Sequence, residues 1–327
     1  MPPSPSLLSR RDFLAGASCA AHLALAGALV PRALRAALWT QPAGRVVARE
    51  PFGALEQVGE GVWALISTPF GGDRTTLANG GIVAGRSGVL AIEGFNTPAG
   101  ARWLAERARE LTGRWPTHAV LTHFHADHAN GVAGYVGAHT SGARCAIHAT
   151  AATRDAVVAR NQPADASREA ALRECVLLPS GEGTTLDLGG RSVRITPRAA
   201  HTASDVAIEV DDPRVVFGGD LLWNGVFPNY VDATASRLAS AAHALRRPDP
   251  VVYVPGHGPL ARRAEFERYV ALLDEVERAA RAAHARGLPV AAAAATFALP
   301  PTLGEWTLFN RVFFERAFAA WYRELGL

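Results

Sequence analysis

The sequence from residue 122 to residue 131 reads THFHADHANG and places three histidines and one aspartate within six positions: His123, His125, Asp127 and His128. The preceding run, residues 118–121, is short and mostly apolar, which predicts the end of a buried strand. We therefore expect the four polar side chains on a loop at the C-terminal end of that strand. Neutral imidazoles and carboxylates are ligands for zinc and other first-row divalent metals.

The spacing within this stretch indicates how one loop could serve two adjacent metals. In an extended segment His123 and His125 point the same way, because side chains alternate with a period of two. The turn that follows can direct Asp127 and His128 toward a second position close by. The competing interpretation is a histidine-rich surface loop without a metal, and later parts of the chain argue against it.

Three later stretches repeat the pattern of a strand-like run followed by a ligand-type residue on a loop. His201 follows the run around residues 193–195, Asp220 ends the run VVFGGD, and His257 follows the run VVYV through a Gly/Pro turn. Together with the first stretch, they give seven candidate metal ligands.

This set resembles the metallo-β-lactamase superfamily over roughly residues 60 to 260. The family pattern His-x-His-x-Asp-His is complete, and the separate His, Asp and His follow in the family's order. The resemblance implies an α/β fold, an αββα sandwich of two mixed β-sheets with outer helices and the metals at the rim between the sheets. It implies that one metal is held by His123, His125 and His201, the other by Asp127, His128 and His257, and that Asp220 bridges both.

The resemblance also implies a cofactor and a reaction. Two zinc ions are expected, with iron or manganese as alternatives, and zinc lowers the pKa of bound water to roughly 7. The resulting hydroxide, with Asp127 orienting the water, would attack an ester, thioester, lactone or lactam carbonyl of a small-molecule substrate. An aspartate at 220 argues against the lactamase subclass that has cysteine there and favours the thioesterase, lactonase and phosphodiesterase branches. An iron-dependent sulfur oxygenase and a non-catalytic accessory protein of a periplasmic quinoprotein system remain the alternatives.

Two further features bear on the site. Trp223, Phe227 and Tyr230 closely follow the expected bridging ligand and are candidate walls of a substrate pocket, or else simply pack the rim. Glu93 stands where the family usually has an aspartate-containing turn. It either supports the metal loop from outside or is an ordinary turn carboxylate.

The N-terminal segment resembles a twin-arginine export signal. Arg10 and Arg11 in SRRDFL precede an Ala-rich apolar stretch over 15–30 that is short and interrupted, so a membrane anchor is the weaker interpretation. Residues 1–37 are therefore expected to be a signal peptide recognised by the twin-arginine export machinery, which would place the protein in the periplasm.

Charge and composition narrow the remaining functions. The net charge is +3, and residues 1–37 carry four arginines and one aspartate, so the rest of the chain is close to neutral and nucleic acid is not an expected partner. All 33 basic residues other than histidine are arginines, so a cationic anchor for an anionic substrate must be an arginine. Cys145 and Cys175 could pair in an oxidising compartment, although two buried thiols are favoured.

The expected layout is a linker with an entry strand over 38–60, the metallo-β-lactamase-like domain over 61–262 and a helical extension packed on it over 263–327. The last helix is rich in aromatic residues, and a soluble chain must bury that face against the sandwich or against a second subunit in a homodimer. Periodicity and capping signals predict helices over residues 97–111, 150–161, 167–175, 234–245, 263–286 and 303–325.

Overall fold

The computed structural model describes residues 44–136 and 144–326. The chain divides into two compact units, residues 1–41 and 42–327, and every described residue belongs to the second. The expected signal peptide over 1–37 lies outside the described residues. Within the described part, no helix combines the length and apolar character needed to span a membrane.

The first sheet has eight strands arranged in chain order, antiparallel from β1 to β5 and parallel from β5 to β8. Parallel neighbours require crossover connections, and these carry α3 (Pro98–Thr112), α4 (Ala126–Ala129), α5 (Ala151–Arg160) and α6 (Ala166–Arg173). The strands are β1 (Arg45–Glu50), β2 (Gly53–Gly59), β3 (Val62–Ser67), β4 (Gly80–Ala84), β5 (Val89–Ile92), β6 (His118–Val120), β7 (Ala146–Thr150) and β8 (Val176–Leu178).

The second sheet has five strands in the order β13-β12-β11-β10-β9. Only β12 and β13 are parallel, so both run toward the same edge of the sheet. The strands are β9 (Thr184–Asp187), β10 (Ser192–Pro197), β11 (Val206–Asp211), β12 (Arg214–Trp223) and β13 (Val252–His257).

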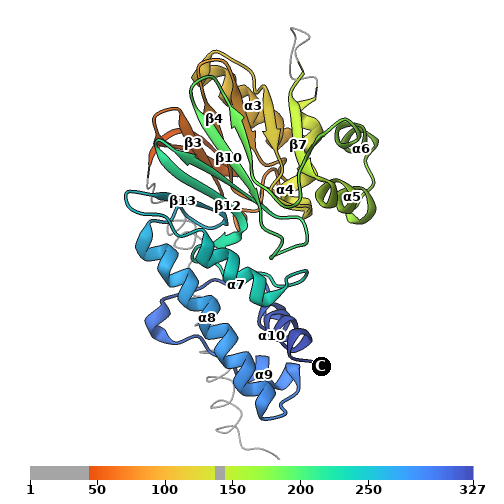
Figure 1. Ribbon diagram of the computed structural model, residues 1–327, viewed down its shortest axis with the longest axis vertical. Helices are drawn as coiled ribbons and strands as arrows, with labels where there is room; N and C mark the ends of the chain where they lie inside the picture. The colour runs from red at the N-terminus through yellow and green to blue at the C-terminus, as the bar shows by residue number, and fades with distance from the viewer. Residues whose placement is uncertain (1–43, 137–143, 327) are drawn as a thin grey trace, which may run out of the picture. The chain divides into compact units, whose positions relative to one another are not determined.

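The two sheets enclose an apolar layer, and helices cover the outer faces (Figure 1). Strand β3 is buried on both sides: Val62 and Ile66 belong to the core between the sheets, whereas Leu65 packs in a second core with Leu104 of α3. On the other side α7 (Ala235–Ala244) and α8 (Arg263–Ala285) contact β12. The predicted αββα sandwich is therefore confirmed, as are five of the six predicted helices, within one or two residues at each end.

Two predicted segments differ in the structure. Residues 45–59 form two strands of the first sheet and not a linker with one entry strand, because β1 is an edge strand that tolerates charged residues on its open side. The last helix, α10, spans Val312–Leu325 and does not begin at 303. The chain instead forms a short 3-10 turn, Pro301–Leu303, and then leaves helical geometry at Gly304, where φ is 73°.

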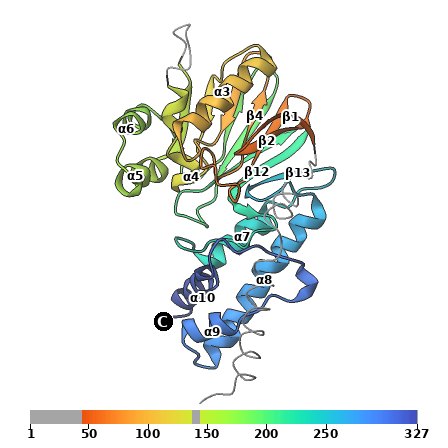
Figure 2. The same ribbon diagram turned by 180° about the vertical axis from the view of Figure 1, so that it is seen from behind.

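The aromatic face of α10 is buried within the chain. Phe318, Trp321 and Tyr322 are each at most 2% exposed, and α10 contacts α7, α8 and α9 (Val290–Thr296), as Figure 2 also shows. Homodimerisation therefore is not needed to cover this face and stays a prediction. Cys145 and Cys175 are both free and half-buried.

Asn79 ties the two sheets together just before β4. Its side-chain oxygen accepts a hydrogen bond from the backbone of Ser67 in β3 (2.8 Å), and its amide donates to the carbonyls of Pro255 (2.9 Å) and Gly258 (2.7 Å) around the end of β13. Asn79 is only 3% exposed, so water cannot replace these bonds.

Replacing Asn79 by alanine should therefore lower the free energy of unfolding by about 3 kcal/mol, because three buried backbone groups lose their partner. Urea unfolding measures this change. Asn96→Ala is the matched control. It removes a single hydrogen bond, to the carbonyl of Arg74, which is more exposed to water than those of Asn79, so the free energy of unfolding should fall by less than about 1 kcal/mol. An equal loss of stability in the two variants would show that the hydrogen bonds of Asn79 between the sheets do not stabilise the fold as expected.

Candidate metal centre

The seven predicted ligands come from four segments that meet at one rim of the sandwich. His123 and His125 leave the end of β6, and Asp127 and His128 lie in the short helix α4 that follows. His201 lies on the loop between β10 and β11, His257 ends β13, and Asp220 lies inside β12 rather than at its end. Because β12 and β13 are parallel, their ligands reach the same edge.

Two glycines allow this approach. A Cβ at Gly256 would lie 2.0 Å from Asp220 Oδ1, so no side chain fits beside that carboxylate. Gly219 has φ of 50°, and a Cβ there would meet the Thr122 side chain at 2.7 Å. Strand β12 therefore bends at Gly219 and brings Asp220 against the histidine-rich loop.

The first group of donor atoms consists of His123 Nε2, His125 Nδ1, His201 Nε2 and Asp220 Oδ2. His125 Nδ1 lies 3.1 Å from His123 Nε2 and 3.1 Å from His201 Nε2. Asp220 Oδ2 lies 3.3 Å from His201 Nε2 and 3.8 Å from His123 Nε2. The four residues form a compact potential metal site.

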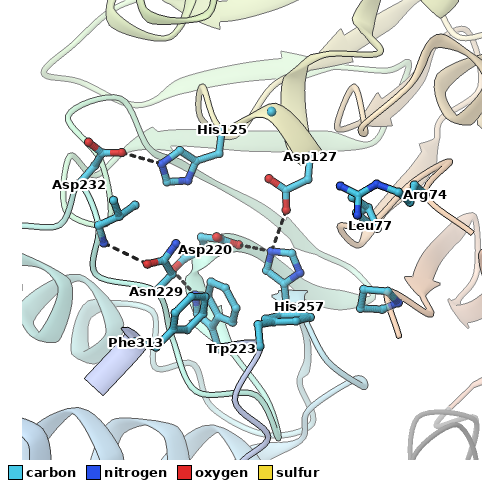
Figure 3. A pocket seen from close by; sticks show the side chains of 14 residues that line it. Arg74, Leu77, His125, Asp127, Asp220, Trp223, Asn229, Asp232, His257 and Phe313 are labelled. Atoms are coloured by element: carbon cyan, nitrogen blue, oxygen red, sulfur yellow. Dashed lines mark hydrogen bonds and ion pairs between the residues drawn. The ribbon is translucent and has the colours of Figure 1, made fainter. Parts of the chain in front are cut away.

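The second group consists of Asp127, His128 and His257, with the other oxygen of Asp220 facing it. His257 Nε2 is 3.3 Å from Asp127 Oδ2 and 3.4 Å from His128 Nε2. Asp220 Oδ1 is 3.2 Å from His128 Nε2 and 3.5 Å from His257 Nε2. The two oxygens of one carboxylate thus face two different groups, as a bridging ligand requires. Figure 3 shows Asp127, Asp220 and His257 converging.

These separations fit metal ligands better than a hydrogen-bond network. Donors held about 2.0–2.1 Å from a tetrahedral zinc lie about 3.4 Å from one another. Two histidines also have their outer nitrogens engaged: His128 Nδ1 is 2.9 Å from Glu93 Oε1, and His125 Nε2 is 2.9 Å from Asp232 Oδ2. When these nitrogens carry the proton, the inner ones present lone pairs to each other and to Asp220. Positive charge at the centre relieves that repulsion.

The electrostatics of the site favour the forms that bind metals. Burial lowers the pKa of His123 well below its ordinary value and that of His201 to about 3, so these imidazoles are neutral at pH 7. Burial raises the pKa of Asp220, but His257 and His128 more than offset it, and the pKa falls to about 2. Burial likewise opposes ionisation of Asp127, yet His128 and His257 hold its pKa below the ordinary range.

Carboxylate charge accumulates around His128. Burial lowers the pKa of this imidazole, but Asp220, Glu93 and Asp127 together raise it well above the ordinary value. The pocket between these groups therefore stabilises a positive charge, which a proton or a metal ion can supply.

Glu93 and Asp232 support the ligands from outside. Glu93 accepts hydrogen bonds from the Thr122 hydroxyl (2.5 Å) and backbone N–H (3.2 Å) in addition to its contact with His128, which decides between its two predicted roles. Asp232 bonds His125 and also Arg160 (2.8 Å). Asp232 is not predicted from the sequence, because nothing in its local pattern distinguishes it from an ordinary loop aspartate.

A cavity of about 430 Å³ opens onto the site. Trp223 forms part of its wall, with its ring 4.4 Å from that of His257. Phe227 and Tyr230, the other two predicted pocket residues, do not line it and are at most 1% exposed. The chain turns at Gly225, where φ is 66°, and Phe227 packs on Phe314 of α10 with the ring centroids 4.8 Å apart.

The fold and the donor set together define a class of protein. Residues 78–257 match the metallo-beta-lactamase superfamily, and the chain belongs to that family. Curated relatives are hydroxyacylglutathione hydrolases. The protein from Rhodopseudomonas palustris (strain BisB5) is 28% identical over 216 residues, covering 66% of this chain and 74% of the relative. The protein from Acidiphilium cryptum (strain JF-5) is 32% identical over 202 residues, covering 61% and 73%.

Solved structures share the fold at low sequence identity. A metallo-β-lactamase from Erythrobacter litoralis, with β-mercaptoethanol in its active site, aligns with a TM-score of 0.56 and 20% identity, covering 70% of this chain and 99% of that one. The inverting sec-alkylsulfatase Pisa1 from Pseudomonas sp. aligns with a TM-score of 0.66 and 17% identity, covering 84% and 50%. With these homologues, the chain is assigned as a metal-dependent hydrolase.

Asp232→Ala should weaken the binding of a divalent metal, with added zinc as the probe, by about 10- to 100-fold, because His125 loses the carboxylate that orients its ring. Competition with a chromogenic chelator measures the affinity. Arg160→Ala is the control: it removes the ion pair to Asp232 but leaves the bond to His125. It should change affinity by less than about threefold. A wild-type affinity in Asp232→Ala would show that His125 does not depend on this contact.

Proposed function

We propose that this protein is a dinuclear zinc hydrolase that cleaves an ester or thioester carbonyl, with lactones and lactams as the related alternatives. The observation that carries the proposal is the placement of Asp220. One oxygen faces His201 at 3.3 Å and the other faces His128 at 3.2 Å, so a single carboxylate serves two triads of ligands.

The residues fit the chemistry that two zinc ions supply when bound: polarisation of a carbonyl oxygen and a lowered pKa for water. His123, His125 and His201 would hold one ion, and Asp127, His128 and His257 the other. Asp127 has a second task. At 29% exposure it is more open than the buried Asp220, at 4%, and it lines the cavity. Its ionised carboxylate can orient a water molecule by accepting a hydrogen bond from it.

The thioester is the substrate class that the relatives favour. The curated relatives are named hydroxyacylglutathione hydrolases, and they match about three quarters of their own length. The likeness to lactamase structures, at 20–21% identity, supports the fold alone. An aspartate at 220, and not a cysteine, agrees with this preference.

Metal content combined with activity tests the proposal. The purified wild-type protein, analysed by plasma mass spectrometry, should contain two zinc ions per chain and hydrolyse members of an ester, thioester, lactone and lactam panel in a zinc-dependent manner. His123→Ala and Asp220→Ala should lose metal and activity together. One iron and no zinc would instead support the sulfur oxygenase, and metal loading without turnover on any panel member would support an accessory role.

Export belongs to the same proposal. The twin arginines at positions 10 and 11, followed by an apolar stretch, support delivery to the periplasm by the twin-arginine route, which carries folded proteins. Fractionation of cells that express the full chain should recover the protein in the periplasm. A variant with Arg10→Lys and Arg11→Lys should remain in the cytoplasm. Periplasmic recovery of this variant at the wild-type level would refute this route.

A further inference from the structure

Arg74 lines the cavity from the loop between β3 and β4, and among the described residues that line it Arg74 is the only arginine. Its side chain is exposed and makes no ion pair or hydrogen bond with any part of the chain that the structure describes. Figure 3 places it beside Leu77, on the side of the cavity where Asp127 and His257 lie.

The backbone that carries Arg74 is held in place. Asn96 donates a 2.6 Å hydrogen bond to the Arg74 carbonyl, and Asp73 accepts one from the N–H of Thr75 (2.8 Å). Thr97 donates to the Thr75 carbonyl through its N–H and its hydroxyl. Leu77, three residues later, has φ of 68°, a conformation that costs energy for a branched side chain. The loop therefore holds the backbone of Arg74 in place, while the guanidinium stays exposed at the cavity.

The acidic residues that line the cavity contact other groups and do not pair with Arg74. Asp127 and Asp220 face the imidazoles as candidate metal ligands. Asp232 is engaged by His125 at 2.9 Å and by Arg160 at 2.8 Å. A guanidinium so placed can pair with an anion that enters the cavity, and its planar fork fits a carboxylate with two parallel hydrogen bonds.

Another part of the cavity wall is apolar and is formed by aromatic residues. Phe309 and Phe313 join Trp223 in lining the cavity. The Phe309 ring lies 5.7 Å from that of His257 and stacks on Phe70 at 4.7 Å. Residues 309 and 313 fall beyond the segment that matches the family, 78–257, so this part of the wall is added by the C-terminal extension.

The segment that carries Phe309 is fastened to the body of the domain. Thr307 exchanges two backbone hydrogen bonds of 2.9 Å with the loop after β12: its N–H donates to Gly225, and its carbonyl accepts from Phe227. The aromatic wall is thus part of the folded domain although it comes from the far end of the chain.

We infer that the substrate is a thioester or ester that combines an aromatic or similarly apolar acyl group with a carboxylate. The apolar group packs on Trp223, Phe309 and Phe313, and Arg74 binds the carboxylate. Hydrolysis adds the elements of water across the acyl–sulfur bond: the acyl carbon gains the hydroxyl, the C–S bond breaks, and the thiol leaves with the proton. This inference rests on the proposed function, and it specifies the substrate class.

The first test compares an anionic probe with its neutral counterpart, S-phenylacetyl-3-mercaptopropionate and the corresponding propionamide, on the zinc-loaded protein. The wild-type protein should prefer the anion, and Arg74→Ala should reduce the ratio of the two kcat/KM values by about tenfold or more, mainly through KM. Arg74→Lys should keep part of the preference. Arg173→Ala, an exposed arginine of α6 outside the cavity, should keep all of it.

A binding measurement separates this inference from the proposed function. The amide analogue 3-(phenylacetamido)propionate resembles the probe and resists cleavage, so calorimetry can follow its binding. The neutral control is the corresponding amide, 3-(phenylacetamido)propanamide. Loss of affinity of about tenfold or more for the anion in Arg74→Ala, with little change for the neutral amide, shows that Arg74 binds the carboxylate, and this result does not depend on thioester turnover. If Arg74→Ala loses affinity equally for both ligands, or for neither, Arg74 does not bind the carboxylate and the inference is wrong. The proposed function is judged separately, by whether the wild-type protein hydrolyses thioesters.

The aromatic wall is tested by Phe309→Ala. The side chain is 36% exposed, so its removal should leave the fold unchanged. The preference for phenylacetyl over acetyl thioesters should fall by about fivefold or more, because a ring-sized apolar contact is lost. Leu111→Ala on α3 is the control, because Leu111 is 37% exposed and is not among the residues that line the cavity. An unchanged preference in Phe309→Ala would remove the C-terminal segment from substrate recognition.

Discussion

The structure depends on one electrostatic constraint: imidazole nitrogens and carboxylate oxygens face one another across 3.1–3.8 Å at the rim of the sandwich. Lone pairs at this distance repel unless positive charge lies between them. The repulsion is strongest at Asp220, because its Oδ1 is buried without a hydrogen-bond partner in the described part of the chain. Such an arrangement persists only where the surrounding fold imposes it.

The fold imposes it through strand ends and outer carboxylates. β6, β12 and β13 deliver their ligands to one rim, and Gly256 and Gly219 let the backbone of the second sheet come close. Glu93 and Asp232 orient two imidazoles from behind. The ligands are therefore placed by buried, hydrogen-bonded backbone and are largely preorganised before any metal enters.

Apart from Trp223 at the end of β12, the residues proposed to recognise the substrate come from other parts of the chain than the metal ligands. The ligands come from strand ends, a loop and a short helix, whereas Arg74 lies on the loop before β4, and Phe309 and Phe313 lie just before and at the start of α10. Loops on a rigid scaffold can change their side chains without disturbing the scaffold. This division fits a superfamily in which one metal-binding framework carries different specificities.

The sequence by itself determined the ligand-type residues and the helices. A strand-like run followed by histidine or aspartate is a local signal, and so is the helical periodicity of residues 97–111 or 263–286. The strands β1 and β2 were less visible, because an edge strand carries charges that also suit a linker. The 3-10 turn and loop before α10 were likewise hidden within a run rich in aromatic residues.

Only the tertiary structure decided which partners meet. Asp232 lies 107 positions from His125, so no local pattern links them. Trp223 lines the cavity while Phe227 faces the interior, because the chain turns at Gly225 between them. Phe309 reaches the site only because Thr307 pairs with the loop after β12. Such contacts depend on how distant segments pack, and a one-dimensional pattern contains only what neighbouring residues impose on each other.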